Sequence, residues 1–273
     1  MTDEFPTREA PFDTVSKDYD RLFSQTTLGQ WLRSQVQEKL ARHFSAGDHI
    51  LELGCGTGED ALWLASREIK VTATDQSMLM LEQTQSKISA AGITDLVQTL
   101  QLDLNDMQTD FQTKFDGLFA NFGVLNCVED RPLLARKLAG WLRPGGKAVF
   151  VVMNPICPWE FFWYLAHGQP GKATRRFHQQ LSVSLPGNQR IEISYPGPRR
   201  IASEFSPSFQ LRSVQGLGTF LPPSYLSPLL ERYPRIFKTL YWLEKRTATA
   251  FPWTRLNDHY VVIVQRTQKE VMY

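Results

Sequence analysis

Three glycines at alternate positions, Gly54, Gly56 and Gly58, follow a short apolar segment and precede a predicted helix. Glycine lets a ligand approach the backbone where a side chain would block it. The Gly-x-Gly-x-Gly spacing is tighter than the Gly-x-Gly-x-x-Gly of dinucleotide sites, which seat a pyrophosphate on the helix N-terminus. Glu59 and Asp60 in the first turn would also repel a phosphate. The loop therefore favours a nucleoside that carries no phosphate.

The chain around this loop alternates apolar strands with amphipathic helices. Strands are predicted over residues 49–54, 70–75, 96–104, 115–121 and 147–153, and helices over 28–45, 59–67, 77–90 and 130–142. Because each strand is apolar through its length, we expect a parallel α/β sheet that is covered on both faces.

This pattern breaks after Met153, where the chain becomes aromatic, basic and rich in Pro and Gly. Two insertions are predicted between sheet elements, over 155–195 and 221–256. The first should contain a hairpin around 185–188, and a helical stretch over 225–247 should be broken at a proline. The remaining strands are predicted over 209–220 and 258–265.

Two acidic residues end the strands next to the glycine loop. Asp75 closes the segment 70–75, where the carboxyl ends of parallel strands meet, so its carboxylate is placed to accept hydrogen bonds from two ribose hydroxyls. Asp103 ends the following strand and could accept from an adenine amino group while Leu104 packs on the ring.

Taken together, these motifs resemble the class I S-adenosylmethionine-dependent methyltransferases that act on small molecules. Five segments match that family in order: 51–58, Asp75, Asp103-Leu104, the strand 115–121 and the run 142–147. The resemblance implies a Rossmann-like, seven-stranded, mostly parallel sheet with helices on both faces, an antiparallel last strand at 258–265, and a helical, aromatic cap insertion. It also implies an N-terminal helical cap over the cofactor, residues 1–45, and a methyltransferase domain over 46–273.

The resemblance further implies a set of residues that bind S-adenosylmethionine. The glycine loop would hold the methionine end, the acid at 75 the ribose, the acid at 103 the adenine, and a tyrosine would cover the cofactor. The candidate cofactor-binding residues are Tyr19, Gly54, Cys55, Gly56, Gly58, Asp75, Gln76, Asp103, Leu104 and Asn121. No metal site is expected, and no catalytic side chain is assigned.

Methyl transfer from a sulfonium is an SN2 displacement, which needs alignment and desolvation more than an oxyanion hole. The aromatic, basic cap favours a small, largely apolar acceptor that could carry a carboxylate, and His167, His178 or His259 could serve as a general base. Three alternatives stay open: a nucleic-acid methyltransferase, a protein that binds the cofactor without catalysis, and a nicotinamide-dependent reductase. The acceptor and the oligomeric state cannot be read from the sequence.

Composition places the chain among ordinary globular proteins rather than disordered or disulfide-stapled ones. Its mean hydropathy is −0.29, its three cysteines form no Cys-x-x-Cys, and no apolar run of membrane-spanning length occurs. The acidic start of the chain does not resemble a signal peptide, so we expect a cytoplasmic protein. Charge is uneven: residues 1–154 hold 15 basic and 21 acidic residues, whereas residues 155–273 hold 15 and 7.

Overall fold

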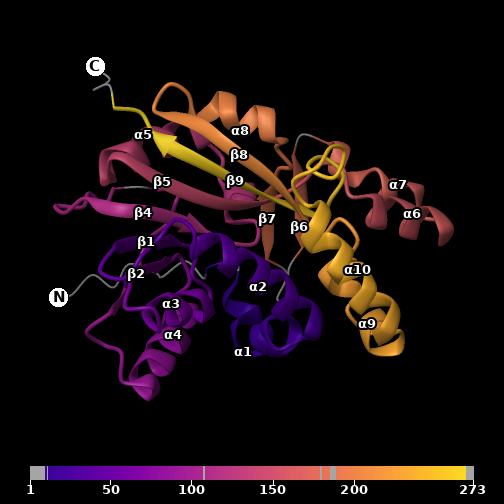
Figure 1. Ribbon diagram of the computed structural model, residues 1–273, viewed down its shortest axis with the longest axis horizontal. Helices are drawn as coiled ribbons and strands as arrows, with labels where there is room; N and C mark the ends of the chain where they lie inside the picture. Colours follow the sequence, from indigo (N-terminus) through magenta and orange to yellow (C-terminus); the bar gives the residue numbers. More distant parts are fainter. Residues whose placement is uncertain (1–9, 11, 107, 179, 185–188, 269–273) are drawn as a thin grey trace.

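The computed structural model describes residue 10 and residues 12–106, 108–178, 180–184 and 189–268. It has a seven-stranded sheet with the strand order β3-β2-β1-β4-β5-β9-β8 (Figure 1). The strands are β1 (His49–Leu53), β2 (Lys70–Asp75), β3 (Val97–Gln101), β4 (Phe115–Ala120), β5 (Leu142–Met153), β8 (Phe209–Leu217) and β9 (His259–Arg266). Strands β1 to β5 are parallel, and β9 lies antiparallel between β5 and β8. The predicted sheet, including its antiparallel last strand, is confirmed.

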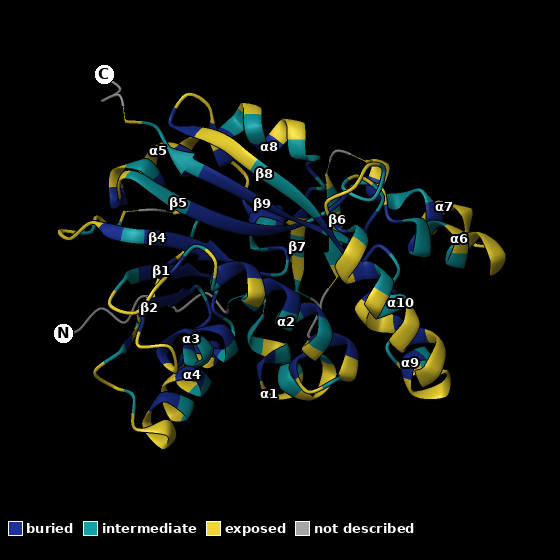
Figure 2. Ribbon diagram, viewed as in Figure 1, coloured by how far each residue is buried: buried dark blue, intermediate teal, exposed yellow. Residues whose placement is uncertain are grey.

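Helices cover both faces of this sheet, as the continuous apolar strands predict. Alternate residues of one strand enter different cores: in β5, Val149 and Val151 pack on one side, and Phe150 and Val152 on the other. The first core takes residues from α2 (Thr27–Leu40), α3 (Glu59–Ala65) and α4 (Met78–Ala91), and the second from α5 (Arg131–Trp141) and α8 (Pro198–Phe205). The central strands are consequently buried almost throughout (Figure 2).

Several predicted elements are longer than the observed ones, among them β3, α2 and β8, which ends at Leu217 rather than at residue 220. Strand β3 ends at Gln101 rather than at residue 104, because it is an edge strand and its partner β2 ends at Asp75. The backbone N–H of Leu102 still donates to the Asp75 carbonyl at 3.0 Å, and Asp103 then lies in a loop. Helix α2 ends at Leu40 and continues only as turns.

Short helices and strands make up the segments before α2, after β4 and beyond β5. Short helical turns η1 (Asp13–Val15), α1 (Ser16–Tyr19) and η2 (Asp20–Ser24) precede α2, and η3 (Val124–Cys127) follows β4. The first predicted insertion, 155–195, contains α6 (Pro158–Ala166), α7 (Pro170–Ala173), η4 (Arg175–Phe177) and the strands β6 (Leu181–Ser184) and β7 (Arg190–Ile193). The second holds η6 (Ser224–Leu226), α9 (Pro228–Arg232) and α10 (Pro234–Thr247), so the predicted break at the proline is confirmed.

Strands β6 and β7 pair antiparallel as a separate two-stranded sheet. Their pairing is that of a hairpin, with Ser184 opposite Arg190. The turn predicted at 185–188 lies outside the described residues. No helix in the described ranges is long and apolar enough to cross a membrane.

A buried ionic cluster fastens α6 and η4 to the sheet. The guanidinium of Arg176 donates to Glu160 of α6 at 3.0 Å and to Asp258, next to β9, at 2.6 Å. It also donates to the backbone carbonyls of Asn154 and Asp258. The side chains of Arg176, Glu160 and Asp258 are 7%, 2% and 5% exposed, so this cluster is a structural connection and not a solvated basic face.

Candidate functional site

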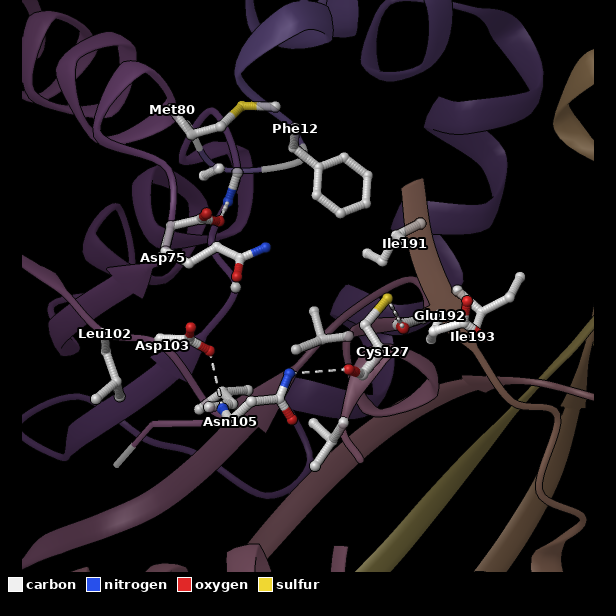
Figure 3. A pocket seen from close by; sticks show the side chains of 18 of the residues that line it. Phe12, Asp75, Met80, Leu102, Asp103, Asn105, Cys127, Ile191, Glu192 and Ile193 are labelled. Atoms are coloured by element: carbon white, nitrogen blue, oxygen red, sulfur yellow. Dashed lines mark hydrogen bonds between the residues drawn. The ribbon is translucent and has the colours of Figure 1, made fainter. Parts of the chain in front are cut away.

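A cavity of about 1050 Å³ opens at the carboxyl ends of β1, β2 and β4. This volume is at the upper end of the range that ligand pockets span. Figure 3 shows its two sides, with Asp75, Met80 and Phe12 facing Cys127 and Ile191. The predicted site residues that line it are Tyr19, Gly54, Gly56, Asp75, Gln76, Asp103, Leu104 and Asn121.

The glycine loop forms one wall, and its three glycines have different roles. All three have positive φ, which disfavours other residues. A Cβ at Gly54 or Gly58 would come within 2.5 Å of Val124 or 2.6 Å of Thr84, so these two positions are glycine because of packing. At Gly56 the nearest atom is a tyrosine ring carbon 4.0 Å away. Of the three glycines, only Gly56 therefore leaves open to the cavity the space that a side chain would fill.

Asp75 stands at the junction of the loop and β2, where its carboxylate is fixed by the backbone. One oxygen accepts the N–H of Gly56 and the other that of Ser77, each at 2.9 Å. The residue is only 9% exposed. Burial raises the pKa of Asp75 above its usual range, although these backbone donors partly oppose the shift. The carboxylate is thus both a wall of the cavity and the support of the glycine loop.

The loop after β3 is tied to the segment after β4 by Asn105. Its backbone N–H donates to the Asp103 carboxylate at 2.8 Å, and its side-chain amide donates to the Cys127 carbonyl at 3.2 Å (Figure 3). The Glu129 N–H donates back to the Asn105 side chain at 2.9 Å. Asp103 is therefore held beside the cavity, although it lies beyond the end of the strand that was expected to carry it.

Asn121, at the end of β4, connects the cavity to the helices behind it. Its amide nitrogen donates to the buried Asp60 carboxylate at 2.7 Å, and its oxygen accepts the Phe122 N–H at 2.9 Å. Asp60 also forms an ion pair with Arg33 of α2, and Glu59 pairs with a lysine of α4 at 2.6 Å. Both acids are thus partly neutralised and would repel a phosphate less than two free carboxylates, so the tight glycine spacing disfavours a phosphate more than their charge does.

The N-terminal turns contribute Tyr19 and Phe12 to the cavity. The neighbouring Asp20 accepts a hydrogen bond from Thr57 in the glycine loop at 2.6 Å and pairs with Lys87 of α4 at 2.5 Å. Burial raises the pKa of Tyr19, which keeps its hydroxyl protonated near neutral pH. The N-terminal segment thereby contacts the loop that was predicted to bind the cofactor.

The opposite wall comes from the small sheet of β6 and β7, which lies within the predicted insertion at 155–195. Val183 of β6 and all four residues of β7, Arg190 to Ile193, line the cavity. Pairing of β6 with β7 places these residues, and no local pattern shows which side of a short hairpin faces inward. Three of these five residues are aliphatic, and Glu192 and Arg190 have opposite charges, in contrast to the acidic side at the ends of β2 and β3. We call this side the aliphatic wall.

Some predicted residues lie elsewhere. Cys55 and Gly58 do not line the cavity: the Cys55 thiol is buried against Thr84, and burial raises its pKa well above the usual range. Among the described residues no histidine lines the cavity. His259 packs edge-on against Phe122 at 5.8 Å and faces the Asp258 carboxylate at 3.0 Å. The described residues also contain no group of three or more His, Cys, Asp or Glu that could hold a metal.

Asn126 holds the aliphatic wall in place through Ser194, the residue that follows β7. Its amide donates to the carbonyls of Ser194 (2.7 Å) and Met153 (3.1 Å), and its oxygen accepts the Met153 N–H at 2.9 Å. Asn126→Ala should lower the free energy of unfolding by about 1–3 kcal/mol, because it leaves buried backbone groups unpaired. Urea unfolding would measure this, with the exposed Glu129→Ala as control. An unchanged midpoint for Asn126→Ala would show that these bonds do not hold the wall.

The sheet order, the glycine loop at the carboxyl end of β1 and the acids after β2 and β3 define a Rossmann-like class I fold with a ligand cavity at its topological switch point. Residues 50–146 match the family model described as a methyltransferase domain. Together with the relatives and solved structures below, this match makes the chain similar to class I S-adenosylmethionine-dependent methyltransferases.

Curated relatives match over about half of the chain. A demethylmenaquinone methyltransferase of Symbiobacterium thermophilum is 32% identical over 155 residues, which is 55% of this chain and 60% of that protein. A 2-phytyl-1,4-naphtoquinone methyltransferase of Synechococcus elongatus is 30% identical over 55% of this chain and 65% of its own length. A tRNA 5-carboxymethoxyuridine methyltransferase of Escherichia coli is 27% identical over 52% and 56%. The match thus spans less than two thirds of each of these relatives.

Solved structures share the fold over nearly the whole chain. An S-adenosylmethionine-dependent methyltransferase from Mesorhizobium loti covers 89% of this chain with a TM-score of 0.54 and 18% identity. The CcbJ methyltransferase from Streptomyces caelestis covers 96% with a TM-score of 0.61 and 16% identity. The [4+2]-cyclase SpnF covers 94% with a TM-score of 0.62 and 14% identity. Since the fold also occurs in a cyclase, architecture alone does not define the reaction.

Proposed function

We propose that this protein transfers a methyl group from S-adenosylmethionine to a small, largely apolar acceptor by direct SN2 displacement. The observation that supports this most is the two-sided cavity: an acidic, glycine-lined wall at the ends of β1 to β3 faces an aliphatic wall on β6 and β7. A polar cofactor and an apolar acceptor need such different surfaces within one enclosed space.

The residues present fit this cofactor. Gly56 leaves room for a ligand against the backbone, and Asp75 and Asp103 are the acids proposed to bind ribose and adenine. The lining residues include five acids, Asp75, Asp103, Asp106, Glu129 and Glu192, and one basic residue, Arg190. This balance suits a positively charged ligand. When bound, S-adenosylmethionine supplies an electrophilic methyl group on a positively charged sulfur.

The chain's own residues would act by binding, orientation and exclusion of water. Asp75 fixes the loop that receives the cofactor, and Phe12 and Tyr19 cover it from the N-terminal side. Ile191 and Ile193 would position the acceptor and keep the cavity dry. Alignment and desolvation are the main requirements of a displacement at a methyl carbon, so the lack of a cavity-lining histidine among the described residues is compatible with it.

We propose a prenylated naphthoquinol as the first acceptor to test. Two relatives are named for demethylmenaquinone and a phytyl naphthoquinone, and the aliphatic wall would suit such a hydrocarbon-bearing ring. Purified protein would be incubated with S-adenosylmethionine and either this quinol, a hydrophilic catechol or tRNA. Release of S-adenosylhomocysteine should be greatest with the quinol. Turnover with tRNA alone would favour the nucleic-acid alternative, and cofactor binding without release would favour a non-catalytic binder.

Replacing Asp75 tests the cofactor site directly. Asp75→Asn keeps the side-chain size but removes the charge and places an N–H₂ group against the N–H of Gly56 or Ser77. The affinity for S-adenosylmethionine should fall by about 1.5–3 kcal/mol, roughly tenfold to a hundredfold, the range for hydrogen bonds to a charged group. Isothermal titration calorimetry would measure it. Asp95→Asn, the same change at an exposed position, should bind S-adenosylmethionine normally. An equal loss of affinity in both variants would mean that the net charge of the protein, and not the position of Asp75, determines binding.

A further inference from the structure

One end of the molecule carries all the exposed aromatic side chains of the described residues. These are Phe162, Phe177, Tyr225, Tyr233, Trp242 and Phe251. Helices α6, α7, α9 and α10, on or beside which they lie, project from the same end of the sheet (Figure 1), and much of their outer surface is exposed (Figure 2). We refer to these four helices with η4, η6 and the turn that follows α10 as the aromatic end.

The aromatic end is one connected surface rather than separate protrusions. Trp159 of α6 packs on Phe237 of α10 with ring centroids 6.1 Å apart, and Tyr164 of α6 stacks on Tyr225 of η6 at 6.0 Å. Phe237 is buried in the first of these contacts, whereas Tyr225 in the second is still 44% exposed. The outer sides of α6 and α10 expose large apolar groups, since Phe162 is 65% and Ile236 58% accessible. Apolar groups that gather on one surface mark interaction sites.

Basic side chains lie against several of the exposed rings. The Arg246 guanidinium is 3.6 Å from the ring centroid of Trp242, and those of Arg232 and Arg255 lie 5.5 and 5.9 Å from the rings of Tyr233 and Phe251. An apolar ring beside a cation is the arrangement that proteins place at the level of lipid headgroups, where one part contacts hydrocarbon and the other phosphate.

The charge of this end is strongly one-sided. Helices α9 and α10 carry five basic residues, Arg232, Arg235, Lys238, Lys245 and Arg246, against two acidic ones, Glu231 and Glu244. Lys245 is paired with Glu38 of α2, which leaves four basic residues without an ion pair in the described part of the chain. Glu244 is buried and accepts hydrogen bonds from the backbone N–H groups of residues 218–220, so its charge does not face the solvent. Residues 1–154, with 15 basic and 21 acidic residues, carry the opposite net charge, which would orient this end toward an anionic partner.

We propose that the aromatic end docks onto an anionic lipid surface, with its exposed rings and Ile236 entering the headgroup region and its basic side chains contacting lipid phosphates. A second copy of the chain fits less well, because two such ends would repel each other. Nucleic acid also fits less well, because Arg246 already occupies one face of Trp242, and aliphatic groups such as Leu165 have no partner on a phosphate backbone. This docking is independent of the proposed reaction and requires neither cofactor nor acceptor.

Vesicle flotation tests the proposal with the full chain and no added ligand. The protein should float with vesicles of equimolar phosphatidylglycerol and phosphatidylcholine and largely stay behind with phosphatidylcholine alone. The double variant Phe162→Ser, Ile236→Ser should bind the anionic vesicles on the order of tenfold more weakly or worse, because it removes apolar groups that would enter the bilayer. The matched double variant Leu133→Ser, Leu211→Ser changes exposed apolar residues elsewhere and should float like the original protein.

The electrostatic part is tested by Arg235→Gln with Lys238→Gln, neither of which has an ion-pair partner in the described residues. Each lost charge should weaken anionic vesicle binding roughly fivefold, and added salt should reduce the difference. Circular dichroism would establish that every variant is folded. Equal flotation of the original protein and the Phe162, Ile236 variant would overturn the proposal. So would binding only to an RNA oligonucleotide, or a dimer in sedimentation velocity that this variant abolishes.

Discussion

Gly56→Val should abolish binding of S-adenosylmethionine while leaving the fold intact. The Cβ of residue 56 has no protein atom closer than 4.0 Å, so a valine there occupies cavity space and does not clash with the core. Its φ of +56° adds strain of about 1–2 kcal/mol, which a chain of this size can tolerate. Affinity should drop by more than roughly a hundredfold, because the bulk fills the place where the ligand approaches the backbone. Calorimetric titration would measure it.

Gly92 provides the matched control for this experiment. It also has a positive φ, +66°, and nothing lies within 4 Å of a Cβ built on it, but it ends α4 at the surface, away from the cavity. Gly92→Val should lose similar stability and still bind the cofactor normally. If Gly56→Val bound the cofactor as well as Gly92→Val did, the cofactor would not lie against the glycine loop.

Arg176→Met should lower the free energy of unfolding by about 3–5 kcal/mol, because it leaves two buried carboxylates without their shared cation. Glu160 and Asp258 would remain buried, at 2% and 5% side-chain exposure. Methionine retains most of the volume, so the loss should reflect charge more than packing. Arg175→Met is the neighbouring control: Arg175 also binds Glu160, but its side chain is 31% exposed, and its loss should cost about 1 kcal/mol or less. If urea unfolding showed similar losses of unfolding free energy for the two variants, Arg176 would not be the cation on which the two buried carboxylates depend.

The same variant should change how stability depends on pH. Burial alone would raise the pKa of Asp258, but His259 and Arg176 outweigh burial and lower this pKa. The pKa of Glu160 is likewise lowered, because Arg175 and Arg176 outweigh the effect of burial. An acid whose pKa is lower in the folded than in the unfolded protein stabilises the fold fully when the pH is above its unfolded pKa of about 4. This stabilisation is lost as the pH falls from there through the lower pKa of the folded state. The original protein should therefore lose stability in acid more steeply than Arg176→Met. Parallel pH profiles between pH 7 and about 3 would show that the carboxylates are not paired as described.

Much of the fold and part of the cavity followed from local patterns in the sequence. The alternation of apolar strands and helices predicted the sheet, and the Gly-x-Gly-x-Gly spacing with Asp75 predicted one wall of the cavity. These predictions succeeded because the carboxyl ends of parallel strands must meet at one edge of the sheet. Asp103 lies beside the cavity although β3 ends before it, since the loop after an edge strand still starts at that edge.

Other features required the tertiary structure. Asn126 binds Ser194, 68 residues away, and Arg176 binds Asp258, 82 residues away. No short-range period encodes such pairs, so the aliphatic wall and the buried ionic cluster were not predicted. The sequence by itself therefore determined the layers of the sheet and the glycine-lined wall, whose positions depend on strand period and chain direction. Only the packed chain decided which side of the small sheet faces the cavity and which charges are buried together, because both depend on contacts between segments distant in sequence.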